Sequence, residues 1–283
     1  MTKFLNLTVV IPTIGEKKLL KTISYLNNRK IEPKKIIIVI YKKNFFKIDN
    51  KILKFKNVLV IKTEKRGQVY QRYIGFKNAK TKYVMQLDAD CLIKISSIIK
   101  MISVMANKKK ICVGPCFVNE KNFLPIHQFT DKIGLIRNLK NKILGFPLGL
   151  SIMGSISKSA TNFGVDYRFL KKDKIEVSWI PGGCMMHHRD NLIQKNYYPF
   201  NGKAYCEDLI HSNLLKKKEI KLYIVNKSFC KTSFPEFPNK LKELLYFIRS
   251  YFYTAKIYNT SIFRISFCVI LYFGRYFKRT LIR

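Results

Sequence analysis

Short apolar runs alternate with helix-like segments through the first third of the chain. Residues 17–27 and 69–79 carry apolar side chains at the three- and four-residue spacing of a helix with one buried face. Mostly apolar, β-branched runs that predict buried strands occupy residues 7–11, 36–40, 58–61 and 83–87. Strand–helix alternation with strands this apolar predicts an α/β fold, with a mostly parallel sheet between helices.

The pattern is less regular beyond residue 114. Gly and Ser concentrate in residues 145–159, which we expect to form loops. Residues 207–219 have helical spacing, and residues 221–225 form a strand-like run. We therefore expect one large domain over residues 1–235, followed by a shorter C-terminal segment.

The C-terminal segment, residues 236–283, is rich in aromatic and basic side chains at helical spacing. Its apolar run from Ile265 to Gly274 is about ten residues long, whereas a membrane-spanning helix needs about 20. A helix lying in a membrane interface and an amphipathic helix packed on the domain both fit this pattern. We expect no membrane-spanning helix.

Charge is the strongest compositional bias. Lys and Arg number 54 against 17 Asp and Glu, for a net charge of +37, while 47% hydrophobic residues exclude a disordered chain. Lysine among many Ile and Asn is what an AT-rich coding sequence produces on solvated surfaces. The alternative is attraction to an anionic partner, either nucleic acid or a membrane with acidic lipids.

The seven cysteines form no CxxC pair and have no zinc-site spacing. We expect them to be small buried side chains in a reducing compartment. The N-terminus lacks the features of a secretory signal peptide. These observations favour a cytoplasmic location.

Two carboxylates, Asp88 and Asp90, follow the strand predicted at 83–87. This is the carboxyl edge of a parallel sheet, where open α/β folds bind ligands. Carboxylates two residues apart in a turn can share a divalent cation with phosphate oxygens. Mg²⁺ or Mn²⁺ there neutralises the charge of a departing diphosphate.

Segments of the chain between about residues 6 and 230 resemble, in order, the inverting glycosyltransferases of family 2, which have the GT-A fold. The segments that carry the resemblance are Val9–Thr13, Gly67–Gly75, Ala79–Asp90, Trp179–Cys184 with Arg189–Asp190, and Cys206–Asp208. The resemblance implies sugar transfer from a nucleotide diphosphate to an acceptor hydroxyl with inversion. It also implies a nucleotide-sugar half, residues 1–115, and an acceptor half, residues 116–235.

On the donor side, the resemblance implies a nucleotide site lined by Pro12, Thr13 and Glu16 and supported by Arg72. Asp88 is expected to face the ribose or the metal, and Asp90 to bind the metal, Mg²⁺ or Mn²⁺. Alternatively, Arg72 is an ordinary charged residue on the surface, without a role in the nucleotide site.

On the acceptor side, the resemblance implies that Asp208 is the general base and that Glu207 helps to place the acceptor. A helix N-terminal carboxylate is the alternative for Asp208. Because Gly182 and Gly183 have no side chains, a sugar can approach their backbone closely. Trp179 either stacks on a sugar or fills the core.

Two departures from the family pattern concern the donor site. Tyr41 follows the second strand, where relatives carry an acidic residue that contacts the base, so a UDP-sugar is only the default donor. Residues 228–231 read Ser-Phe-Cys-Lys where many relatives place a metal-binding His. A third protein ligand is therefore left open.

Together these observations favour a transferase of bacterial surface polysaccharide synthesis, such as capsule or O-antigen. Its acceptor is expected to be a glycan or polyprenyl-linked glycan, at the cytoplasmic face of an anionic membrane. A catalytically degenerate scaffold and a basic nucleic-acid-binding protein are the alternatives. Because no helix-turn-helix, zinc-finger or RNP signature is present, we expect no nucleic-acid partner.

Overall fold

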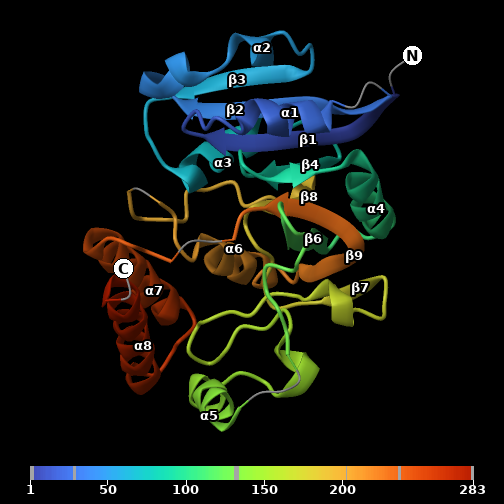
Figure 1. Ribbon diagram of the computed structural model, residues 1–283. Coiled ribbons are helices and arrows are strands. Elements are labelled where there is room, and N and C mark those ends of the chain that lie inside the picture. Colours follow the sequence, from blue (N-terminus) through green and yellow to red (C-terminus); the bar gives the residue numbers. More distant parts are fainter. Residues whose placement is uncertain (1–2, 28–29, 131–133, 202, 235–236, 282–283) are drawn as a thin grey trace.

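The apolar runs form the strands of one central sheet in the computed structural model, which describes residues 3–27, 30–130, 134–201, 203–234 and 237–281. The strands follow the order β3-β2-β1-β4-β8-β6-β9-β5, and β7 pairs with β9 (Figure 1). Their bounds are Lys3–Thr13 (β1), Ile31–Tyr41 (β2), Val58–Thr63 (β3), Tyr83–Leu87 (β4), Leu92–Ile93 (β5), Ile111–Asn119 (β6), Lys174–Glu176 (β7), Cys184–His188 (β8) and Lys221–Thr232 (β9).

Helices cover the sheet and extend beyond it. The α-helices are Leu19–Leu26 (α1), Asn50–Leu53 (α2), Gln68–Asn78 (α3), Ile95–Met105 (α4), Leu135–Leu144 (α5), Glu207–Lys216 (α6), Leu241–Ile257 (α7) and Ile262–Leu281 (α8). Short 3₁₀ helices span Lys42–Lys47 (η1), Gly149–Ile152 (η2), Tyr167–Phe169 (η3) and Arg189–Asn191 (η4). The predicted α/β class is confirmed.

Strand pairing brings the predicted motifs together. The pairings β1–β2, β2–β3, β1–β4 and β6–β9 are parallel, and they include the longest ladders. Strand β8 is antiparallel to both β4 and β6. Because Leu87 pairs with Cys184, the residues after β4 lie beside those before β8. The Asp88 N–H donates to the Gly183 carbonyl at 2.8 Å.

Strand β1 shows how alternation places the two helix layers. Its residues Leu7, Val9 and Ile11 share a buried cluster with α1, whereas Val10 packs with Phe76 of α3 on the opposite face. Successive strand side chains point to opposite faces, so an unbroken apolar strand requires a helix on each side.

The sequence pattern missed strand β6 and helix α5. Strand β6 contains Gly114 and Pro115, and its pairing with β9 shifts register between Pro115 and Cys116. Proline has no N–H for the ladder, and such residues argue against a strand when read from sequence. Helix α5 has only Leu144 buried, so packing on the domain does not explain its apolar pattern. The expected loops at 145–159 are present, interrupted by η2.

Helices α7 and α8 pack on α6 and on residues 144–160 rather than standing apart from the domain. The Tyr258 hydroxyl donates to the Leu209 carbonyl of α6 at 2.9 Å, and the Tyr251 hydroxyl donates to the Ser159 carbonyl at 2.8 Å. The predicted boundary between residues 235 and 236 lies outside the described residues. None of the helices described is long and apolar enough to cross a membrane.

Helix α3 lies so close to β1 that only glycine fits at their contact. A Cβ at Gly75 would stand 2.2 Å from Cγ1 of Val10. We expect Gly75→Ala to lower the free energy of unfolding by about 1–3 kcal/mol, because overpacking outweighs the gain in helix propensity. Urea denaturation measures this change. Gly274→Ala is the matched control, since nothing lies within 4 Å of its added carbon. Equal midpoints for the two variants would contradict the close packing.

Candidate functional site

The loop after β1 is held in place by its own side chains. The Thr13 hydroxyl donates to the Glu16 carboxylate and accepts from the Gly15 N–H at 2.9 Å. From α3, the Gln71 amide donates to the Thr13 carbonyl at 2.9 Å and to the Val39 carbonyl at 2.7 Å. Pro12 and Thr13 are buried, whereas Glu16 is exposed. The loop therefore has a fixed backbone at the carboxyl end of β1, where α/β sheets bind ligands.

Arg72 of α3 is the centre of the site. Its side chain is 2% exposed, which excludes a surface role. The guanidinium donates to Asp88 at 2.7 Å, to the Gly182 carbonyl at 3.1 Å and to the Glu207 carboxylate. Burial alone lowers the pKa of Arg72, but the charges of Glu207 and Asp88 outweigh it and raise that pKa. Arg72 is therefore a buried cation that joins two motifs distant in sequence.

Asp88 and Asp90 differ in their surroundings. Oδ1 of Asp88 accepts from Arg72 and from the Gln68 amide at 2.9 Å, two side chains one turn apart on α3. Asp90 is exposed. Partial burial and the charge of Asp88 raise the pKa of Asp90, with a smaller contribution from Glu16. Negative charge thus accumulates on the solvent side of this pair.

The two glycines before β8 allow close contact with the acidic motifs. A Cβ at Gly182 would stand 2.2 Å from Oε1 of Glu207, and one at Gly183 would stand 3.2 Å from Sγ of Cys91. The Gly182 carbonyl also accepts from the Gln86 amide at 2.7 Å. In this structure, protein contacts are sufficient to require glycine at position 182.

Glu207 and Asp208 begin α6 but have different roles. Glu207 is buried, and both of its oxygens are engaged, one by Arg72 and the other by the Tyr197 hydroxyl at 3.0 Å. Asp208 is half-buried, and burial together with the charge of Glu207 raises its pKa to about 7. Two partners therefore hold Glu207 in place, whereas the pKa of Asp208 lets that carboxyl exchange a proton near neutral pH.

Tyr197 and His211 extend this network and were not predicted as site residues. Because the Tyr197 hydroxyl donates to Glu207, it accepts from Nδ1 of His211, 2.9 Å away. Burial lowers the pKa of His211 to about 3, so the ring is neutral and its Nε2 carries the lone pair. Glu207 and His211 are four residues apart on α6, a spacing that signals a shared face. Tyr197 lies in an irregular segment without such a signal.

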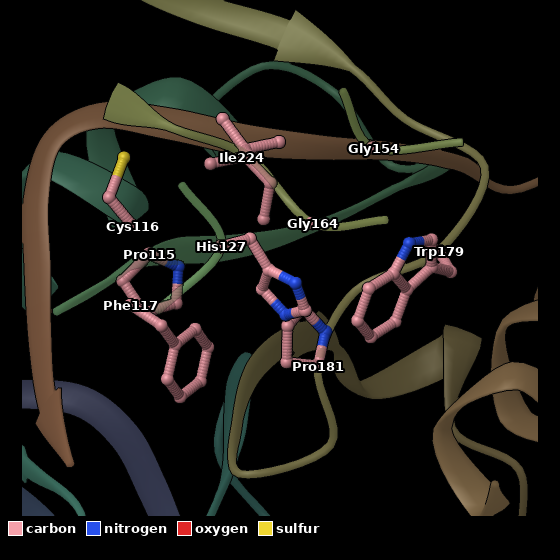
Figure 2. Close-up of a pocket in the computed structure, with 10 residues that line it drawn as sticks. Pro115, Cys116, Phe117, His127, Gly154, Gly164, Trp179, Pro181 and Ile224 are labelled. Carbon is pink, nitrogen blue, oxygen red and sulfur yellow. The ribbon is translucent and has the colours of Figure 1, made fainter. Parts of the chain in front are cut away.

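Trp179 lies to one side of this network. Its indole N–H donates to the Phe163 carbonyl at 3.1 Å, and its ring meets His127 edge-on at a centroid distance of 5.9 Å. Figure 2 shows both rings lining a pocket with Phe117 and Pro181. The pocket has a volume of about 10 Å³, roughly what one water molecule requires. Trp179 therefore acts as a packing residue in this conformation.

A larger cleft lies on the other side of the site, between the start of α3 and the segment before α6. Its volume is about 460 Å³, within the usual range for small-molecule sites. Lys65 and Arg66 line it on one side, and Tyr198 and Phe200 on the other. Gln68, which also lines the cleft, connects it to Asp88.

The carboxylates fit a divalent cation that completes its coordination with ligand oxygens. No group of three His, Cys, Asp or Glu residues with metal-binding geometry exists within the described ranges. Asp90 and Oδ2 of Asp88 are the oxygens not taken by Arg72. Mg²⁺ commonly uses one or two protein carboxylates plus phosphates. At the position of the missing family His, the Ser228 hydroxyl donates to the Ser97 carbonyl and Cys230 is buried.

The fold matches solved glycosyltransferases that share little sequence with the chain. GalNAc-T7 with UDP, GalNAc and Mn²⁺ has a TM-score of 0.57 and 19% identity over 81% of this chain and 43% of its own. Staphylococcus aureus TarS residues 1–349 with UDP-GlcNAc has a TM-score of 0.52 and 12% identity over 88% and 64%. The mannosyltransferase PcManGT of Pyrobaculum calidifontis, with GDP-Man and Mn²⁺, has a TM-score of 0.52 and 14% identity over 92% and 68%.

The chain thus spans less than two thirds of the first two of these proteins. A comparison with curated proteins gives no match. The family model for glycosyl transferase family 2 matches residues 8–162, more than half of the 283 residues, and includes the β1 loop, Arg72 and both aspartates after β4. On this match the resemblance inferred from sequence is confirmed, and the chain belongs to glycosyl transferase family 2.

Proposed function

We propose that this glycosyltransferase is a metal-dependent, inverting enzyme that moves a sugar from a nucleotide diphosphate to a hydroxyl of a glycan or lipid-linked glycan. The observation that carries the proposal is the buried Arg72, which binds both Asp88 and Glu207. Through it, the carboxylates on the donor side and the base at the start of α6 share one rigid frame. A displacement needs its nucleophile and leaving group held in line, and such a frame supports that geometry.

Asp208 is the general base in this proposal. With a pKa raised to about 7, its carboxylate removes a proton from the acceptor hydroxyl as that oxygen attacks the anomeric carbon. Arg72 and Tyr197 hold the two oxygens of Glu207, and burial together with the charge of Glu207 raises the pKa of Asp208, which makes Asp208 a stronger base. Attack opposite the leaving nucleotide inverts the anomeric centre in a single displacement.

Asp88 and Asp90 would hold a divalent cation, Mg²⁺ or Mn²⁺, which would complete its coordination with oxygens of the donor. When bound, the cation supplies positive charge that stabilises the departing nucleotide diphosphate. The solved structures of GalNAc-T7 and the mannosyltransferase contain Mn²⁺, which supports a divalent metal. Arg72 contributes by fixing Asp88 Oδ1, which leaves the second oxygen free.

The β1 loop, with Pro12, Thr13 and Glu16, forms the nucleotide side of the proposed donor site. A UDP-sugar is the default donor, and the similar structures contain either UDP with GalNAc, UDP-GlcNAc or GDP-Man. Tyr41 ends β2 at the position where relatives carry the base-contacting acid, so base recognition rests on other groups of this edge.

The acceptor side supports an anionic, partly apolar substrate. The cleft beside Gln68 combines Lys65 and Arg66 with the rings of Tyr198 and Phe200. A lipid-linked diphosphate glycan has matching chemistry, which fits surface polysaccharide synthesis by a peripheral protein at the cytoplasmic face of a membrane. A scaffold without catalysis is the second candidate, and the intact pairing of Arg72 with both acidic motifs disfavours it.

Donor binding is expected to depend on Asp90. We expect one of the UDP-, GDP-, CDP- or dTDP-sugars to raise the melting temperature with Mn²⁺ or Mg²⁺, because a ligand at a hundredfold over Kd stabilises the native state by about 2.7 kcal/mol. Asp90→Ala removes a metal oxygen and abolishes the shift. Asp190→Ala is the control, since Asp190 follows the far end of the β4–β8 pair. A shift retained in Asp90→Ala would contradict the metal site.

Asp208→Asn tests the base. We expect sugar transfer, followed as release of nucleotide diphosphate from the donor that binds, to fall by about 10²–10⁴-fold, the usual contribution of a general base. Donor binding by thermal shift stays unchanged because the carboxylates after β4 are intact. A variant with wild-type turnover would favour the scaffold.

The pH dependence of kcat/KM is expected to change when the charge of Glu207 is removed. In the wild type, kcat/KM rises with pH through an apparent pKa of about 7, because only ionised Asp208 accepts the proton. Glu207→Gln removes a like charge beside Asp208, so the acid limb moves to lower pH. Steady-state rates of both proteins between acidic and neutral pH measure this movement. An acid limb at the same pH in both would assign the titration to another group.

A further inference from the structure

Large apolar side chains stand in solvent at one end of the acceptor half. In α5, Leu135 is 88% exposed, Ile136 87% and Leu139 60%. Ile262 and Phe263, at the start of α8, are 82% and 67% exposed. Large apolar side chains exposed to this degree on neighbouring helices are typical of an interaction site. We call these five residues the apolar tip.

Two segments far apart in sequence form the tip together. The Arg264 side chain donates through Nε to the Ile143 carbonyl at 3.2 Å, which joins the first turn of α8 to the last turn of α5. Leu144 and Cys268 share the buried cluster beneath this contact. In Figure 1, α5 lies at the end of the molecule opposite strands β1 to β3.

Helix α5 has the side-chain order of a helix that lies in a membrane interface. At about 100° per residue, Leu135, Leu139 and Ile136 lie within an arc of about 100°. Lys142 borders one edge of this arc and Lys140 the other. Lysines at those edges can extend their charged ends to head groups while their stems lie along apolar surface.

Helix α8 continues the apolar surface away from the tip. Phe263, Ile270 and Phe277 recur at seven-residue intervals and therefore share one face, and all three are exposed. The opposite face buries Cys268 and packs Tyr272 into the domain. Packing on the domain thus explains one face of α8 and leaves the other without a partner among the described residues.

The charge of the segments around the apolar tip indicates what kind of partner the tip binds. The sequence contains no Asp or Glu between residues 132 and 165 or after Glu243, whereas basic residues recur through both stretches. A second copy of the chain would bring two such positive surfaces together, which like-charge repulsion opposes. A bilayer with acidic lipids offers negative charge over an apolar interior.

We propose that the apolar tip inserts into the head-group region of an anionic membrane, with α5 as the element that enters it. The C-terminal segment alone was the predicted membrane contact, so α5 adds a site from the acceptor half itself. The inference rests on the proposed function in one respect, that a lipid-linked acceptor gives the enzyme a reason to dock on lipid. Insertion at the tip holds the acceptor half against the bilayer.

Vesicle co-sedimentation of the full chain tests this inference. We expect binding to vesicles of phosphatidylcholine mixed with phosphatidylglycerol, weaker binding to phosphatidylcholine alone, and loss of affinity at high salt. The double variant Leu135→Ser/Ile136→Ser is expected to bind at least about tenfold more weakly, because two exposed apolar side chains no longer enter the lipid. Phe46→Ser is the matched control, since Phe46 is 79% exposed on η1 in the nucleotide half.

Wild-type affinity in the double variant, or no binding by the wild type to acidic vesicles, overturns the inference. Self-association that is lost in the double variant, without vesicle binding, assigns the tip to a second copy of the chain instead. Nucleotide-sugar thermal shifts on the same preparations separate the two proposals. If the donor binds but vesicles do not, the membrane inference fails and the transferase proposal stands. If vesicles bind but neither donor binding nor turnover is found, the transferase proposal fails and the membrane inference stands.

Discussion

The buried ion pairs of Arg72 are the interaction on which the site depends. One guanidinium, 2% exposed, holds carboxylates from the end of β4 and the start of α6. Removing one partner of such a buried arrangement typically costs about 3–5 kcal/mol, because it leaves an uncompensated charge. Arg72 lies between the half-buried Asp88 and the buried Glu207 and offsets the repulsion between them. That constraint fixes the spacing between the end of β4 and the start of α6, the proposed donor and acceptor sides.

The same ion pairs give the adjacent acids Glu207 and Asp208 different surroundings. Arg72 and Tyr197 bind the two oxygens of Glu207, and the charge of Glu207 adds to burial in raising the pKa of Asp208, which no described cation contacts directly. A carboxyl with a pKa raised to about 7 is a strong enough base to accept a proton and still ionised in a useful fraction at neutral pH. His211, kept neutral by burial, orients Tyr197 without adding charge. The neighbours of Asp208 thus set the properties that suit it to the proposed role of proton acceptor.

Sheet topology makes this arrangement possible. An antiparallel β8 beside the parallel β4 places Gly183 against Asp88, and the missing side chain at Gly182 admits Glu207. Helix α7 is linked to the same region, because Tyr258 donates to Leu209 one residue after Asp208. The C-terminal helices therefore connect α6, which carries the proposed base, to the apolar tip, which carries the proposed membrane contact.

Sequence alone determined the elements whose signal is local. Continuous apolar runs specified the strands through β4, since burial on two faces demands them, and the strand end located Asp88 and Asp90. Family resemblance supplied Asp208. Only the tertiary structure decided which residues from distant parts of the chain come into contact. Arg72 and Glu207 are 135 positions apart, and no periodicity in the sequence pairs them. Tyr197 joined the site through an irregular segment. Helix α5 has apolar side chains at helical spacing that the sequence analysis did not assign, and only the tertiary structure shows that their arc faces solvent.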